Sequence, residues 1–249
     1  MTLLVAPAKL TWFLEVTGRR ADGYHELRSE MVTLNLADRL DVDPEGDYLR
    51  FEPPVPGVVA DETNLIARAL RLVGRRAGVV VHKEIPPGGG LGGGSADAAA
   101  ILRWAGGVSA EAALSLGGDV PFCQVGGRAL VEGVGERLTP LEDDPRSLTL
   151  LLLDFGVNTA ACYRAYDELV ARGERPGGRN HLERAACLVE ERLARALDWA
   201  RAEFGAGVTL AGSGSTMYLE GHLREHDTSW DVNGPDGTIR IRQTTTSPR

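Results

Sequence analysis

One short stretch of the sequence, residues 88–95, holds residue types and spacing that suit polyphosphate binding. Six of the seven residues from 88 to 94 are glycines, and strong helix formers follow in "SADAAAILRWA". The first N–H groups of a helix lack intrahelical partners, and the helix dipole places partial positive charge there. Glycines let an anion reach several N–H groups at once. The stretch predicts a phosphate-binding loop before a helix from about Ser95, with Ser95 as its cap.

Other interpretations of the glycines are weaker. Gly88, Gly90 and Gly93 satisfy the dinucleotide pattern G-x-G-x-x-G, but so glycine-rich a run matches many patterns by chance. The next segment, "GGVSAEAALSLGGDV", is helical again, which does not fit a βαβ unit. The P-loop pattern fails because no Lys-Ser/Thr follows the run. A flexible linker is disfavoured because the run joins a predicted strand directly to a helix.

A lysine and an aspartate elsewhere could perform phosphoryl transfer. This chemistry needs a positioned alcohol, neutralisation of charge and a place for the proton. Lys9, in "PAKL", could stabilise the charge that develops on oxygen, and Asp119, in "GGDVPF", could accept the alcohol proton. Taken alone, Lys9 is more typical of a solvated surface and Asp119 of a tight turn. Their assignment depends on the other motifs.

The composition limits the class of protein. The chain has 249 residues and a formal net charge of -8, so general affinity for nucleic acid is not expected. Three widely spaced cysteines without a CxxC pair indicate reduced thiols in the cytoplasm. The histidines show no zinc-ligand spacing with them. Neither a signal peptide nor a membrane-length apolar stretch is expected.

Hydrophobic periodicity predicts a mixed order of strands and helices. Strands are expected at 3–6, 11–16, 78–85 and 238–243, with a break at "APAK" between the first two and hairpins over 117–141. Helices are expected at 61–76, 95–105, 109–116, 160–172 and 181–204. The polar stretch 142–147 is the predicted domain boundary.

Together these motifs resemble a known superfamily. "PPGGGLGGGSADAA" is similar to the central motif of the GHMP kinases, whose glycine loop wraps the triphosphate of ATP. "APAKLTWFLEV" resembles the first motif of that superfamily and "LAGSGSTMYLE" the third. The segments "TGRRADGYHEL", "DETNLIARALRL", "HKEIPPGGGLGGGS" and "GGDVPFCQVGGRALVEGVGE" most resemble the 4-diphosphocytidyl-2-C-methyl-D-erythritol kinases of the non-mevalonate isoprenoid pathway.

The resemblance implies an α/β (α+β) fold in two domains. Residues 1–145 would form an ATP-binding domain like domain 2 of ribosomal protein S5, and residues 146–249 a ferredoxin-like domain. The implied reaction is ATP- and Mg²⁺-dependent phosphorylation of the 2-hydroxyl of 4-diphosphocytidyl-2-C-methyl-D-erythritol. The implied partner is this small molecule, without nucleic acid or membrane, and the protein would be a cytoplasmic monomer or homodimer.

The resemblance also assigns site residues. The catalytic pair would be Lys9 and Asp119. The ATP-binding residues would be Asn64, Lys83, Pro87, Gly88, Gly89, Gly90, Leu91, Gly92, Gly93, Gly94 and Ser95. The substrate-binding residues would be Thr11, Tyr24, His25, Thr159 and Tyr163, with Tyr24 and His25 on the cytidine. Thr11, Ala96 and His181 depart from the family pattern; Ala96 replaces a second serine and leaves Ser95 as the one candidate metal ligand of the loop.

Alternatives stay open at this point. Another GHMP kinase, for mevalonate, phosphomevalonate or homoserine, would also carry these general motifs, although "DGYH" and the context of Lys83 argue against it. A catalytically silent nucleotide-binding relative is disfavoured by the presence of both Lys9 and Asp119. An NAD-dependent oxidoreductase would depend on Gly88, Gly90 and Gly93 alone.

Overall fold

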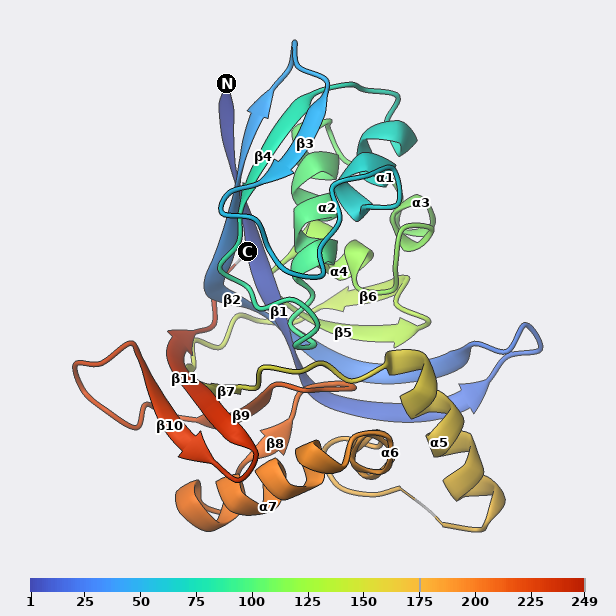
Figure 1. Ribbon diagram of the computed structural model, residues 1–249. Coiled ribbons are helices and arrows are strands. Elements are labelled where there is room, and N and C mark those ends of the chain that lie inside the picture. Colours follow the sequence, from blue (N-terminus) through green and yellow to red (C-terminus); the bar gives the residue numbers. More distant parts are fainter. Residues whose placement is uncertain (175, 249) are drawn as a thin grey trace.

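The computed structural model describes residues 1–174 and 176–248, which build two β-sheets with helices packed on them (Figure 1). The strands of these residues form a six-stranded and a five-stranded sheet. Every strand of the six-stranded sheet ends by Pro140, and every strand of the five-stranded sheet begins at Ser147 or later. The division into domains at 145/146 stays a prediction.

The six-stranded sheet has the order β3-β4-β2-β5-β6, with β1 also paired to β2. Its strands are β1 (Thr2–Arg19), β2 (His25–Asp43), β3 (Tyr48–Phe51), β4 (Gly78–His82), β5 (Arg128–Gly133) and β6 (Arg137–Pro140). One face is covered by α1 (Leu65–Leu72), α2 (Gly93–Trp104), α3 (Ala110–Leu114) and α4 (Val120–Val125). Helix α2 lies closest to the sheet and buries a run of alanines against β1.

β1 and β2 form one long antiparallel hairpin, so the predicted break at "APAK" is wrong. The chain accommodates Pro7, which has no N–H, by a register shift between Pro7 and Lys9. The N–H of Lys9 donates to the carbonyl of Leu91, 3.0 Å away. The strand is therefore tied at Lys9 to the glycine-rich loop.

The five-stranded sheet has the order β10-β11-β7-β9-β8. Its strands are β7 (Ser147–Leu152), β8 (Thr209–Leu210), β9 (Met217–Glu220), β10 (Ser229–Gly234) and β11 (Gly237–Thr245). Its helices are α5 (Thr159–Ala171), α6 (Glu183–Val189) and α7 (Glu191–Phe204). Residues of all three pack against this sheet, and α5 and α6 also pack against Leu14 on β1.

Two sequence predictions in this half needed correction. The helix expected over 181–204 is interrupted at Glu190, whose extended backbone separates α6 from α7. The tail contains a β10–β11 hairpin where one strand was expected. Among the residues that the structure describes, no helix is long and apolar enough to cross a membrane.

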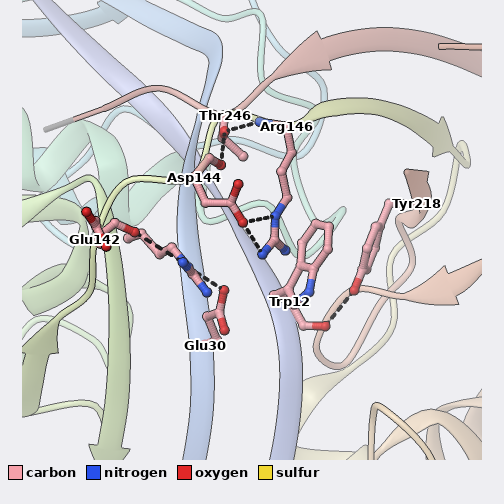
Figure 2. A network of polar contacts seen from close by, with 8 residues as sticks. Trp12, Glu30, Glu142, Asp144, Arg146, Tyr218 and Thr246 are labelled. Carbon is pink, nitrogen blue, oxygen red and sulfur yellow. Dashed lines mark hydrogen bonds and ion pairs between the residues drawn. The ribbon is translucent and has the colours of Figure 1, made fainter. Parts of the chain in front are cut away.

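The two sheets share one hydrophobic cluster. Leu148, Leu150 and Tyr218 of the second sheet are buried in the same core as the first. At this junction the hydroxyl of Tyr218 donates to the carbonyl of Trp12 (2.5 Å), and the guanidinium of Arg146 lies 4.2 Å from the centre of the Trp12 ring (Figure 2). The junction positions β1, and with it Lys9, relative to the second sheet.

Candidate active site

The glycine-rich loop lines a cavity of about 410 Å³ at the N-terminus of α2. Helix α2 is capped by Gly92, whose φ of +69° lies in the left-handed region, and no side chain caps its first N–H groups. The expectation that Ser95 is the cap is therefore wrong, because Ser95 lies inside the first turn. The uncapped N–H groups beside the cavity are the donors that a phosphate chain requires.

The loop lies against Lys9. A Cβ on Gly92 would lie 2.8 Å from Cγ of Lys9, so a larger residue would clash with the lysine stem. Lys9 is buried, with 7% of its side chain exposed, and its ammonium lies 3.0 Å from a carboxylate oxygen of Asp119. Thr11 accepts a second hydrogen bond from this ammonium, at 3.2 Å. The structure thus brings the two predicted catalytic residues together.

Asp119 precedes α4, which the sequence prediction treated as part of a hairpin. Pro121 in the first turn of α4 suits a helix start, because its missing N–H would be unpaired there in any case. The carboxylate makes no capping hydrogen bond to α4 and is 32% exposed. It is therefore free to face the cavity.

A second cavity, of about 610 Å³, opens beside the first. The two cavities share Ser95, Asp119 and Thr159 as lining residues. A molecule held in one cavity can therefore meet a molecule held in the other next to the Asp119 carboxylate. This arrangement suits the transfer of a group between two bound molecules.

The second cavity contains the predicted cytidine-binding residues. His25 stacks on Tyr163 with ring centres 4.7 Å apart, and its Nε2 lies 2.7 Å from a carboxylate oxygen of Asp167. Tyr24 lines the cavity mouth and is 66% exposed. Burial raises the pKa of the Tyr163 phenol, so this ring is neutral.

Lys83 is held by two buried carboxylates. Its ammonium contacts Asp38 and lies 2.8 Å from Asp97. Burial alone would lower the pKa of Lys83, but the charges of Asp97 and Asp38 outweigh it and raise the pKa. Burial raises the pKa of Asp97 to about 7, against the opposing charge of Lys83. Asp38 also accepts the N–H groups of Glu84 and Ile85, which fixes the chain that enters the glycine loop.

All the residues predicted to bind ATP line the first cavity, and Tyr24, His25, Thr159 and Tyr163 line the second. In the described part of the chain, Lys9 and Thr11 line neither cavity, since both are buried behind Asp119. Sequence reasoning missed Asp38, Asp97 and Asp167. Asp38 carried a signal, because it falls on the buried face of β2 between Leu36 and Leu40.

Two of the departures from the family pattern, His181 and Ala96, lie at positions that matter for the structure. Asn180, the residue before His181, donates to the carbonyls of Leu210 and Gly212 and so holds the second glycine turn, which is residues 211–216. The neighbouring His181 accepts the N–H of Val16 at its Nδ1, which joins this segment to β1. Ala96 is fully buried on α2, where a serine hydroxyl would meet the core.

The fold and the paired cavities define a small-molecule kinase of the GHMP class. A family model described as the GHMP kinases N terminal domain matches residues 64–127. A 4-diphosphocytidyl-2-C-methyl-D-erythritol kinase from Dechloromonas aromatica is 38% identical over 86% of this chain and 85% of that protein. This chain belongs to the 4-diphosphocytidyl-2-C-methyl-D-erythritol kinase family, and ATP is its phosphoryl donor.

Solved structures agree with this assignment. A crystal structure of a 4-(cytidine 5'-diphospho)-2C-methyl-D-erythritol kinase matches the full length of both chains, with 32% identity and a TM-score of 0.74. The mevalonate kinase of Methanococcus jannaschii matches with 14% identity and a TM-score of 0.59 over 99% of this chain and 98% of that chain. At that identity the mevalonate kinase supports the fold alone.

Proposed function

We propose that this protein transfers the γ-phosphoryl group of ATP to the 2-hydroxyl of 4-diphosphocytidyl-2-C-methyl-D-erythritol. The observation that carries the proposal is the junction of the two cavities at Asp119, with the Lys9 ammonium 3.0 Å from its carboxylate. The relatives' shared name supplies the acceptor. The first cavity would hold ATP, and the second would hold the cytidine-linked alcohol.

Each part of the site has a role in this reaction. The uncapped N–H groups of α2 and the glycine loop would bind the triphosphate, with Asn64 and Lys83 towards the adenine end. Asp119 would accept the proton of the attacking hydroxyl. Lys9 would offset negative charge where the hydroxyl, phosphoryl group and carboxylate meet.

The residues at the junction fit a magnesium ion bound mainly by the nucleotide. No group of three or more His, Cys, Asp or Glu side chains within the described ranges is arranged to hold a metal ion. Mg²⁺ commonly takes only one or two protein oxygens together with phosphate and water. Ser95 and Asp119 line both cavities and would supply such oxygens. Bound there, Mg²⁺ would neutralise phosphate charge.

The second cavity would orient the acceptor. Tyr24 and Tyr163 offer aromatic faces to a pyrimidine, and His25 offers a ring nitrogen to its edge. Thr159 lies where the cavities meet, so it would contact the part of the substrate nearest the phosphoryl group. Thr11 would act indirectly, by holding the Lys9 ammonium.

The test is detection of the phosphorylated product by mass spectrometry, for the wild type and for Asp119→Asn. We expect the wild type to form it and the variant to lose about 10²- to 10⁴-fold in kcat, since Asn cannot accept the proton. Asp198→Asn, at an exposed position of α7, is the matched control and should keep wild-type activity. Phosphorylation of mevalonate or homoserine, with no turnover of the cytidine substrate, would show that the proposal is wrong.

We also propose that the protein works in the cytoplasm. All three cysteines are free in the described part of the chain. Burial raises the pKa of Cys123 to about 12 and that of Cys162 to about 11, so these thiols stay protonated and unreactive near neutral pH. Unpaired, buried thiols are typical of a reducing compartment.

A further inference from the structure

The ring of His25 is oriented by residues of one helix, α5. Asp167 binds Nε2 at 2.7 Å, Tyr163 stacks on one face, and Tyr166 meets the ring edge-on with centres 6.0 Å apart. The side chain of His25 is largely buried, at 9% exposed. These contacts leave the imidazole little freedom to rotate or flip.

Asp167 also determines which ring nitrogen carries hydrogen. An ionised carboxylate only accepts hydrogen bonds, so the Nε2 that faces it must be the donor. The second oxygen of Asp167 lies 3.1 Å from the guanidinium of Arg19, which holds the carboxylate in this orientation. In a neutral imidazole the other nitrogen, Nδ1, then carries a lone pair and can only accept.

Nδ1 is available to a ligand. It makes no hydrogen bond with the described residues, and it is not among their fully enclosed polar atoms that lack a partner. His25 lines the second cavity. The cavity therefore presents a fixed acceptor to the edge of whatever ring is bound there.

A fixed acceptor that faces the exocyclic 4-position of the ring discriminates between the two common pyrimidines. Cytosine carries an exocyclic amino group that donates, whereas uracil carries a carbonyl oxygen that accepts at the same position. Two acceptors that face each other in a half-buried site lose the hydrogen bond and leave both lone pairs unsatisfied. A site built around a hydrogen bond rejects the analogue that cannot make it.

We propose that Asp167 is a specificity-determining positioning residue that, through His25, makes the second cavity select an amino-bearing pyrimidine over its carbonyl counterpart. The inference rests on the proposed function, because it takes the cavity to be the cytidine site. Asp167 lies on α5, more than a hundred residues beyond His25, and it lines the same cavity; the selection we assign to it acts through the His25 ring.

The test compares the binding of cytidine 5'-diphosphate and uridine 5'-diphosphate by calorimetry in the wild type, Asp167→Asn and Glu168→Gln. Asn can accept from or donate to Nε2, so it no longer fixes the tautomer. We expect the wild type to bind the cytidine nucleotide more tightly than the uridine nucleotide. In Asp167→Asn the ratio of the two dissociation constants should fall about tenfold, the effect of roughly one hydrogen bond. Glu168, exposed on the same helix, pairs with Arg172, and its variant should keep the preference.

A second measurement separates positioning from general damage to the site. Nitrogen chemical shifts of the His25 ring should report hydrogen on Nε2 alone in the wild type and a mixture of tautomers in Asp167→Asn. An unchanged nucleotide preference in Asp167→Asn, or hydrogen on Nδ1 in the wild type, would overturn the inference. Neither result depends on turnover, so failure of the kinase assay alone would count only against the proposed function.

Discussion

Among single residues, Asp97 is the one whose charge state should most affect stability. Its folded pKa of about 7 lies above the 3.8 of an unperturbed aspartate because the carboxyl is buried. Between these pH values the folded protein holds a proton that the unfolded chain has lost, so this contribution to stability falls as pH rises towards 7. Well below pH 3.8 both states are protonated and the contribution is complete.

The variant Asp97→Asn tests this dependence, because Asn stays neutral and can still accept from Lys83. We compare the difference in free energy of unfolding, variant minus wild type, at two pH values. We expect this difference to rise by on the order of 1 to 2 kcal/mol from pH 5.5 to pH 8.5. Urea denaturation at both pH values measures the difference. A constant difference would mean that Asp97 does not titrate in this range, as when the charge of Lys83 outweighs burial and keeps the carboxylate ionised throughout.

Prediction from sequence named residues inside contiguous motifs, most of which the structure places around the two cavities, and it missed their partners. The glycine run is a short stretch whose chemistry can be interpreted locally, whereas the assignment of Asp119 depended on the other motifs. Asp97 lies inside such a motif, but its pairing with Lys83 requires α2 to pack beside the end of β4. Asp167 gave no local signal, because its contact with His25 forms only when α5 packs on the tip of the β1–β2 hairpin.

Of the elements, the glycine loop is the one most restricted by its neighbours. Gly90 has a φ of +80°, and a Cβ there would lie 2.7 Å from the carbonyl oxygen of Gly214 in the second glycine turn. The carbonyl of Gly89 accepts the N–H of Thr216 from the same turn. The two glycine segments therefore support each other, and the shape of the first cavity depends on their contact.

We expect Gly90→Ala to weaken ATP binding by at least tenfold and to destabilise the protein by about 2 kcal/mol or more, since backbone strain and a clash add together. Gly107→Ala is the matched control, because its φ of +82° is similar and nothing lies within 4 Å of the added Cβ. The control should cost about 1 kcal/mol and leave ATP affinity unchanged. Equal effects of the two variants would contradict a role for the contact with Gly214.

Element types were easier to predict than their continuity. The hydrophobic periodicities located β4, α2 and α5 within a few residues. The glycines on both sides of α4 were misread as hairpin turns, although Pro121 suits a helix start. Pro7 was misread as the end of a strand, because a long partner strand can carry the chain through a bulge that local propensity cannot reveal.

For the whole molecule, the shared core predicts that the two sheets unfold together. Leu148 and Leu150 of β7 are buried in the cluster that holds the first sheet, and Tyr218 joins β9 to β1 through the Trp12 carbonyl. If the chain divided into separate domains at 145/146, the unfolding of either one alone would expose the part of this cluster that remains in the other. We therefore expect a single cooperative transition, even if the two parts are domains by topology.

Tyr218→Phe tests this coupling, because it removes one hydroxyl and leaves the buried Trp12 carbonyl without its partner (Figure 2). The expected loss is about 1 to 3 kcal/mol in the free energy of unfolding. Urea unfolding should be followed by circular dichroism and by tryptophan fluorescence. The fluorescence is measured with Trp104, in the first part, replaced by Phe and separately with Trp199, in the second part, replaced by Phe. All probes should shift together to lower urea. Two transitions, of which the variant moves only one, would show that the shared core does not couple the sheets and that the halves fold as independent domains.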